Sequence, residues 1–462
     1  MINAARPGDR LLSPKSSAPA FPAYAAPHLV TESSLNISQR AGFLLVLAYL
    51  FMLGSRVQDF VSFLHLPMIV MSFALIAVIG SGELTRVMTS RIAALLLGMT
   101  VWMGLSVPFS VWIGGAMETY LNKWLQTSLI FVIIATLLST LRHVYYAMCM
   151  LAFSILVGAL LTSVMGGSVA GRLVIDNGSR FADPNDLAQF LLLGMCFALG
   201  ALKKKAPLVV RIALLPGLGL ILIQFLRTGS RGGFIGLMAV TLMLFLSSSG
   251  RQRVRAVLAG LIILSLTLTV IPQSIRARYS YIFGVHDEQE DQGESSAEAR
   301  QALFRKSVSI TLRHPIVGVG PGMFAVAENN LAIDQGLARG YWHETHNMYT
   351  QVSSENGIPA LLFFLAILAT ILKRLSAIRR LEKDLPEPGF KEAARLAYWI
   401  RLAVIGFLVT GVFLSCAYSE LFFVLCGLTV ALQRAVNQSS VTIAAPRRKQ
   451  NAPVPALNAH GI

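Results

Sequence analysis

Charged residues are scarce in this sequence. Only 13% of its 462 residues are Asp, Glu, Lys or Arg, about half of the roughly 25% that soluble globular proteins carry. Cysteine is scarce too: the four cysteines lie in apolar runs without C-x-x-C spacing, which argues against a disulfide framework or a cysteine-bound metal. Because hydrophobic residues make up 55% of the chain, a disordered protein is excluded and lipid is indicated as the main solvent.

Apolar runs long enough to cross a bilayer recur along most of the sequence. A membrane-spanning helix needs about 20 largely apolar residues, and about twelve such runs occur. They begin near Ala41, Leu66, Ile92, Trp124, Val144, Asp186, Pro207, Gly232, Ala256, Ile358, Trp399 and Glu420. The last run is the weakest, so about eleven spans remain an alternative. The sequence therefore predicts an all-α integral membrane protein with about twelve transmembrane helices.

The span pattern divides the chain into five segments. Residues 1–40 and 436–462 are polar and rich in proline or alanine, and we predict that both are disordered cytoplasmic tails. Residues 41–271 hold the first nine predicted helices, and residues 357–435 hold the last three. Between them, residues 272–356 form one long loop, and loops of this length usually carry function.

One stretch of the long loop has the spacing of an amphipathic helix. Ser296–Leu312 places Leu303, Val308 and Leu312 among its apolar points and Arg300 among its polar points. A helix of this kind can lie along a membrane surface.

The distribution of basic residues orients the predicted helices. Cytoplasmic connections of membrane proteins carry an excess of Lys and Arg. With a cytoplasmic N-terminus and twelve spans, about two-thirds of the 39 Lys and Arg residues fall on the cytoplasmic side. Both termini are then cytoplasmic, and residues 272–356 lie outside. The net charge of +16 therefore indicates topology and contact with anionic membrane lipid, not nucleic-acid binding.

Some arginines nevertheless fall on the outer side, where this rule depletes them. Arg180 precedes the sixth predicted helix, and Arg300 leads the amphipathic helix. Arg227 and Arg231 flank a tight turn between the seventh and eighth helices. A single arginine can simply reach the lipid headgroups, and this interpretation fits Arg227 best. Several ionisable groups together near hydrocarbon indicate a functional site.

Arg231 has the surroundings of an anion-binding residue. It is followed by Gly232 and Gly233 at the start of a predicted helix. A guanidinium beside the backbone N–H groups of a helix N-terminus suits an anion. Phosphate fits best, as a lipid phosphate or diphosphate at an outer leaflet. Asn185, which follows Arg180 closely, is a further candidate for substrate binding.

Two histidines precede the tenth predicted helix. His343 and His346 are both candidates for a base, because the reference pKa of the histidine side chain lies near neutral pH. We favour His346, with Asn347 placed to orient it, although a histidine that only forms a hydrogen bond remains an alternative. Their H-E-x-H spacing is not the zinc-binding H-E-x-x-H, so no metal is predicted. The glycine-rich stretch Gly318–Gly322 lacks a nucleotide-binding signature and predicts a tight turn.

Five motifs follow one another in a distinctive order. They are Arg-Phe-x-Asp-Pro-Asn from Arg180, Arg-Thr-Gly-Ser-Arg-Gly-Gly from Arg227, Arg300 itself, the His-Pro and glycine-rich run from His314, and His346-Asn347 with Glu355-x-Gly357. This order resembles the O-antigen ligase and O-antigen polymerase family of bacterial inner-membrane proteins. The resemblance covers about residues 175–365 in detail. Where the family often has Asn-Pro-Asn, this chain has Asp183-Pro184-Asn185.

The resemblance implies a C-type glycosyltransferase-like helical fold in the bacterial inner membrane, with the long loop in the periplasm. It implies transfer of a glycan from a polyprenyl-diphosphate-linked donor to an acceptor hydroxyl, without a cofactor, nucleotide sugar or metal. Arg180, Arg231 and Arg300 match the positions that bind the donor diphosphate, and His346 matches the residue at the acceptor. The acceptor is lipid A-core for a ligase and another lipid-linked glycan for a polymerase, as in exopolysaccharide growth; the motifs leave this choice open.

These considerations define the candidate site. We predict three catalytic residues, His346, Arg231 and Arg300, and five substrate-binding residues, Arg180, Arg227, Asn185, His343 and Asn347. A transporter or flippase of lipid-linked glycans is the alternative. It would need arginines along a central cavity, and Arg211 is the exception in predicted spans that are nearly free of charge.

Overall fold

A computed structural model of the chain describes residues 35–169, 171–174, 183–202, 208–251, 253–254, 258, 260, 265, 272–280, 291–337, 340, 342–384 and 387–444. The predicted site residue Arg180 lies outside these residues, as do most of the predicted ninth helix and most of both predicted tails.

Most of the described residues are helical. The first half of the chain forms α1 (Ile37–Ser55), η2 (Val57–Leu64), α2 (Leu66–Ser81), α3 (Leu84–Met88), α4 (Arg91–Ser106), η3 (Val107–Phe109), α5 (Ile113–Glu118), the π-helical η4 (Thr119–Leu125), α6 (Gln126–Leu137), α7 (Leu141–Met165) and α8 (Pro184–Leu202). The second half forms α9 (Leu208–Arg227), α10 (Arg231–Leu246), α12 (Gln273–Ser280), α13 (Asp291–Arg313), α14 (Phe324–Asp334), α15 (Met348–Asp384), α16 (Pro388–Thr410), η7 (Gly411–Phe413) and α17 (Glu420–Ala444). An antiparallel hairpin of β1 (Gly167–Val169) and β2 (Arg172–Val174) joins α7 to the segment before α8.

The helices are those of an all-α membrane protein. Within the described ranges, eight are long and apolar enough to cross a membrane, and η2 with α2 gives a ninth if this bent pair is one span. Two further apolar helices are shorter than a full span: Leu214–Arg227, which is part of α9, and Arg231–Leu246, which is α10. The total of about twelve spans stays a prediction, because most of residues 252–271 lie outside the described ranges.

Several predicted boundaries differ from those observed. Helix α1 begins at Ile37, inside the predicted tail 1–40, because Asn36 and Gln39 form a capping box. Helix α17 extends to Ala444, past the predicted tail boundary at residue 436. The stretch before Trp124, expected to be a connection, is largely helical from Ile113 onward.

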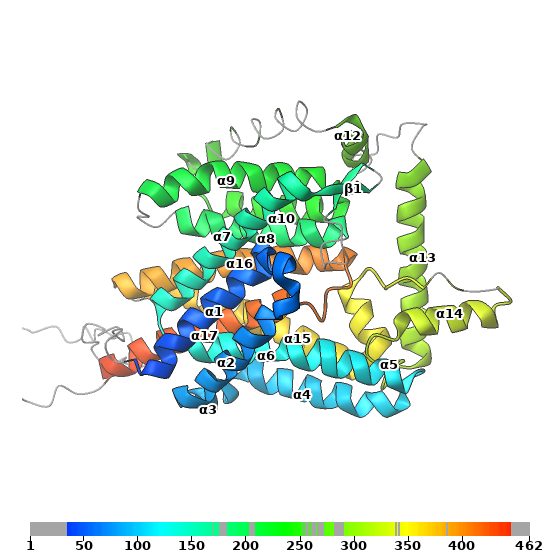
Figure 1. The fold of residues 1–462 in the computed structure, drawn as a ribbon, viewed down its shortest axis with the longest axis horizontal. Coiled ribbons are helices and arrows are strands. Elements are labelled where there is room, and N and C mark those ends of the chain that lie inside the picture. Colours follow the sequence, from blue (N-terminus) through cyan, green and yellow to red (C-terminus); the bar gives the residue numbers. More distant parts are fainter. Residues whose placement is uncertain are drawn as a thin grey trace, which may run out of the picture.

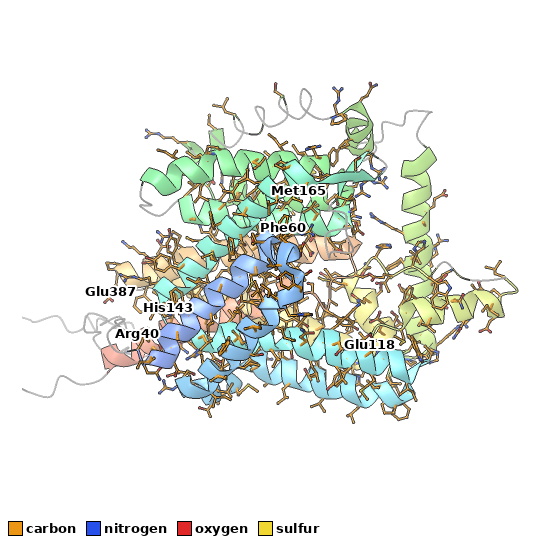
Figure 2. All side chains as sticks on the ribbon, in the orientation of Figure 1. Arg40, Phe60, Glu118, His143, Met165 and Glu387 are labelled. Atoms are coloured by element: carbon orange, nitrogen blue, oxygen red, sulfur yellow. The ribbon has the colours of Figure 1, made fainter. Side chains whose placement is uncertain are left out.

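The helices form a bundle with two distinct ends. In Figure 1 most long helices run roughly side by side, with β1, α12, α13 and α14 gathered toward the right. We call this the loop end. The start of α1 and the end of α17 lie at the left, which we call the terminal end. Figure 2 places Arg40, His143 and Glu387 toward the terminal end and Met165 and Glu118 toward the loop end.

Packing within the bundle relies on small residues at helix contacts. A Cβ at Gly158 of α7 would lie 2.3 Å from the carbonyl oxygen of Gly54 in α1, so the two helices approach closely only because both residues are glycine. Outward faces stay apolar: α2 exposes Phe73, Ile76 and Ile79. This combination suits a bundle surrounded by lipid.

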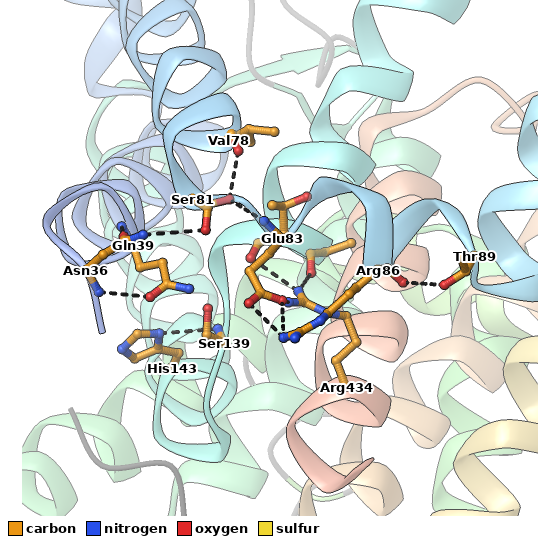
Figure 3. A network of polar contacts seen from close by, with 12 residues as sticks. Asn36, Gln39, Val78, Ser81, Glu83, Arg86, Thr89, Ser139, His143 and Arg434 are labelled. Atoms are coloured by element: carbon orange, nitrogen blue, oxygen red, sulfur yellow. Dashed lines mark hydrogen bonds and ion pairs between the residues drawn. The ribbon is translucent and has the colours of Figure 1, made fainter. Parts of the chain in front are cut away.

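A buried ion pair closes the terminal end. Arg434 of α17 donates to the Glu83 carboxylate at 2.7 Å (Figure 3). It also donates to the backbone carbonyl of Thr136 at 3.2 Å. Glu83 also accepts from the exposed Arg86 at 3.0 Å. Because Arg434 is buried, its charge depends on these partners. This contact fixes α17 against the segment between α2 and α3.

Helix α15 is broken where it meets the glycine-rich segment. Gly357 has φ 80° and ψ 175°, so the helix breaks there. The amides of Val319 and Gly320 donate to the carbonyls of Ser354 and Glu355 at 3.0 and 2.8 Å, and the Ile358 amide donates to the Pro315 carbonyl at 2.7 Å. The segment Pro315–Gly320, which includes the start of the predicted tight turn, is thus hydrogen-bonded to α15 on both sides of the break at Gly357. We call this segment the strap.

Helix α13 confirms the predicted helix over Ser296–Leu312 and extends it at both ends. In Figure 1 it runs crosswise to α4 and α15. Its buried side contains Leu303 and Ile310, whereas Val308 and Leu312 are exposed. The predicted apolar points therefore split between two faces of α13.

Candidate functional site

The turn between α9 and α10 is a compact corner at the loop end. Ser230 caps α10: its Oγ accepts the Gly233 amide at 3.1 Å. A Cβ at Gly232 would lie 2.7 Å from Phe413, and one at Gly233 would lie 2.8 Å from Ala188. The two glycines therefore allow close helix packing, and the Gly233 amide is already used by the cap. Arg231 stands at the first position of the helix.

Asn185 ties this corner to two neighbouring segments. Its Oδ1 accepts from the Ser230 hydroxyl at 2.8 Å and from Arg172 Nη2 at 3.0 Å. Its amide nitrogen donates to Asp183 Oδ1 at 2.8 Å. Since Asn185 is buried with these partners, the structure gives it a positioning role. Contact of Asn185 with a substrate stays a prediction.

Arg172 contacts the same corner, and the sequence analysis did not select it. It lies on β2, donates from Nε to the Thr228 carbonyl at 2.9 Å, and so fastens the hairpin to the corner. Burial lowers its pKa to about 10, with help from the positive charge of Arg278 on α12. The charge rule that drew attention to the other outer arginines applies equally to these two.

Arg300 of α13 shares this environment. Burial lowers the pKa of Arg300, the charges of Arg231 and Arg278 lower it further, and the Asp183 carboxylate opposes them. Arg231 and Arg300, predicted from separate motifs, are therefore close enough to repel each other. Like charges held together by a fold create a site that an anion stabilises.

His346 lies beside this cluster. Burial lowers its pKa below the ordinary 6.5, the charge of Arg300 adds to that effect, and Asp183 opposes it. The charge of the exposed His343 also lowers it. A lowered pKa keeps the imidazole neutral near pH 7, which is the form that accepts a proton.

The backbone at His346 is held in an uncommon conformation. Its φ is 49°, and its amide donates to the hydroxyl of Ser415 at 2.9 Å. Thr345 Oγ1 lies 3.1 Å from the same hydroxyl. Asn347 caps α15, because its Oδ1 accepts the amides of Tyr349 and Thr350 at 3.0 and 3.1 Å. Asn347 thus fixes the helix start next to His346.

Two further predicted residues, Arg227 and His343, lie within the described ranges. Arg227 ends α9 and donates to Gln224 at 3.4 Å, one turn back along its own helix. His343 is exposed in the segment before α15. Within the described ranges, no group of three His, Cys, Asp or Glu side chains is arranged to hold a metal ion.

Comparison with known proteins gives one family. Residues 216–365 match the family model described as O-antigen ligase. The matched stretch runs from α9 into α15 and includes Arg231, Arg300 and His346, while Arg172 and Asn185 precede it. A search of curated proteins finds no match.

Proposed function

We propose that this chain transfers a glycan from a polyprenyl-diphosphate-linked donor to an acceptor hydroxyl, because residues 216–365 match the family model described as O-antigen ligase. The family match and the apolar helices support a role in polysaccharide biosynthesis in a bacterial membrane. The finer proposal includes the inner membrane, cytoplasmic termini and a loop end that faces the periplasm.

One observation carries this proposal. Arg231, Arg300 and His346 come from three separate segments, yet the charge of Arg231 acts on Arg300 and the charge of Arg300 acts on His346. These effects support the proposal that an anion-binding group and a base lie next to each other. Transfer from a diphosphate needs this pair, because the leaving group gains negative charge while the acceptor loses a proton.

The arginines act on the leaving group. When the bond between the anomeric carbon and the diphosphate oxygen breaks, both bonding electrons stay on the diphosphate. The guanidinium groups of Arg231 and Arg300 stabilise this charge, and they do so strongly because they are partly removed from water. Their mutual repulsion in the free protein favours an anion between them.

His346 acts on the acceptor. Its neutral imidazole takes the proton of the acceptor hydroxyl as the oxygen attacks the anomeric carbon. Direct attack on the side opposite the leaving group inverts that carbon. Arg300 supports this step too, because its charge disfavours the imidazolium form before the donor diphosphate arrives.

The test is glycan transfer by the purified full-length protein with a lipid-linked donor. His346→Asn keeps a residue that tolerates positive φ and removes the base; we expect a loss of about 100-fold or more. His65→Asn is the matched control, because the exposed His65 has a similar φ of 47°. Arg231→Lys, compared with Arg305→Lys on the exposed side of α13, tests the anion site. Full activity of both site variants would overturn the proposal.

The acceptor distinguishes the two forms of the proposed activity. In a strain that lacks this protein, loss of glycan-capped lipid A-core with intact polymer indicates a ligase. Accumulation of single lipid-linked repeats indicates a polymerase.

A further inference from the structure

An exposed tryptophan lies four positions before the proposed base. Trp342 keeps 55% of its surface exposed. It lies outside the candidate membrane spans, and the two residues that follow it, His343 and Glu344, are polar and exposed as well. A covering of lipid hydrocarbon therefore does not account for the exposed indole ring.

The backbone holds Trp342 in a conformation that large residues rarely adopt. Its φ is 57°, in the left-handed region that crowds a bulky side chain. Within the described ranges, Trp342 and His346 are two of four non-glycine residues with positive φ. Such conformations persist only where surrounding contacts enforce them, and they gather at functional sites.

Helix α14 enforces the conformation at Trp342. The Trp342 amide donates to Glu328 Oε2 at 3.1 Å, and the Gly340 amide donates to Asn329 Oδ1 at 2.9 Å. Glu328 is fully buried, and its other oxygen accepts from Lys306 of α13 at 2.5 Å. A Cβ at Gly340 would lie 2.5 Å from Glu328 Oε2, so this segment lies directly against α14. A buried ion pair thus fixes the backbone from which the indole projects.

The other end of the segment is fixed as well. The His346 amide donates to the hydroxyl of Ser415 at 2.9 Å. Four residues of extended chain span at most about 14 Å, so Trp342 and His346 lie no farther apart than that at their backbones. A hydroxyl at His346 and a sugar ring at Trp342 can therefore belong to one acceptor glycan.

An indole suits the apolar face of a sugar ring. The C–H groups on that face carry a small positive charge, and the face of an aromatic ring is negative. The sugar hydroxyls need hydrogen-bond partners, and the exposed His343 and Glu344 lie next to Trp342 in the chain. A tryptophan at a membrane interface is exposed too. Such an anchor needs neither a rare backbone conformation nor a buried carboxylate to hold it.

We propose that the indole of Trp342 stacks on a sugar ring of the acceptor glycan and so helps to select the hydroxyl that reaches His346. Glu328 is the positioning residue for this contact. The assignment rests on the proposed function, because His346 marks the acceptor side only if it is the base.

The experiment measures binding of two lipid-free oligosaccharides to the full-length protein in detergent. One is the core oligosaccharide of lipopolysaccharide, and the other is a repeat unit released from its polyprenyl diphosphate, so both forms of acceptor are represented. Because neither carries a diphosphate, binding reports on the acceptor side. Wild type should bind at least one of them.

Three variants separate the aromatic face from other properties of the side chain. Trp342→Asn should bind at least about tenfold more weakly, because the ring is lost while asparagine tolerates positive φ. Trp342→Phe should stay within about threefold of wild type, because it keeps an aromatic face. Trp112→Asn is the control, since Trp112 is 57% exposed but has an ordinary φ of −148°. It should bind as wild type does.

Specific outcomes overturn the proposal. They are failure of wild type to bind either oligosaccharide, wild-type affinity in Trp342→Asn, and an equal loss in Trp112→Asn. Thermal unfolding verifies folding; if Trp342→Asn is unfolded, Trp342→Leu replaces it with the same expected loss, because leucine is apolar without an aromatic face. Equal affinities of Trp342→Leu and Trp342→Phe would show that any apolar side chain suffices, as for a membrane anchor.

Failure of this inference is distinguishable from failure of the proposed function. If wild type transfers glycan and Trp342→Asn binds the oligosaccharide normally, the stacking assignment falls and glycan transfer stands. If oligosaccharide binding depends on Trp342 but no lipid-linked donor supports transfer, the sugar site stands and the enzymatic proposal falls.

Discussion

The backbone amide of His346 donates to the hydroxyl of Ser415, 2.9 Å away and 69 positions later in the sequence. Ser415 lies in the connection between η7 and α17. Since His346 is a non-glycine residue with φ 49°, its conformation needs support from outside its own segment. The candidate base is therefore held by a part of the chain that lies outside the family match.

Ser415→Ala should lower glycan transfer by roughly three- to tenfold, because a neutral hydrogen bond contributes about 1 kcal/mol. The mechanism is a less ordered His346, so kcat should fall more than KM rises. Ser419→Ala is the control in the same connection, since the buried hydroxyl of Ser419 has no partner in the described structure. Equal activity of the two variants would contradict this role of Ser415.

Arg300→Gln should move the acid limb of the pH–rate profile to higher pH. In wild type, burial and the charge of Arg300 lower the pKa of His346, so the neutral base persists below pH 6.5. Without that charge the pKa rises, and protonation removes the base at a higher pH. The measurement is kcat/KM of the residual activity against pH. Arg305→Gln, on the exposed side of α13, is the control and should leave the acid limb of the pH–rate profile in place. An unchanged acid limb in Arg300→Gln would show that Arg300 and His346 are not coupled.

Gly357→Ala should destabilise the protein by more than about 2 kcal/mol. Its φ is 80°, and a Cβ there would lie 1.9 Å from the carbonyl oxygen of Ile316. Gly219→Ala in α9 has open space around the added methyl and should be neutral or slightly stabilising. Thermal unfolding in detergent compares the two. A wild-type Tm for Gly357→Ala would show that the strap does not depend on this glycine.

Glu83→Ala should cost about 3 kcal/mol, because it leaves the buried charge of Arg434 without its carboxylate. Arg86→Ala removes the exposed partner of the same carboxylate and should cost less than about 1 kcal/mol. Unfolding in denaturant measures both changes. Similar losses would mean that the buried pair contributes no more than the exposed one.

Apolar patterning predicted much of the fold. The predicted runs from Leu66, Ile92 and Val144 begin within a few residues of the observed helices, because a bilayer demands long uninterrupted apolar segments. One difference follows from a specific contact, because Asn36 starts α1 early through its capping box. Helix α17 continues to Ala444, past the predicted boundary at residue 436.

The candidate site was predictable in part. The positive-inside rule drew attention to Arg231 and Arg300, and the structure brings them together. The same rule could have indicated Arg172 and Arg278. Nothing marks Ser415 in the sequence, because its role depends on the connection before α17 reaching His346 in space. A pattern of residues along the chain does not show that Ser415 and His346 lie within hydrogen-bond distance.

The strap across the break in α15 has a mechanical consequence. It fastens the chain just after α13, which carries Arg300, to the first turns of α15, which follow His346 directly. If the part of α15 after Gly357 tilted as the surrounding bilayer changed thickness, these hydrogen bonds would keep the segments of Arg300 and His346 together. The spacing between the proposed leaving-group ligand and the proposed base would then depend little on membrane thickness.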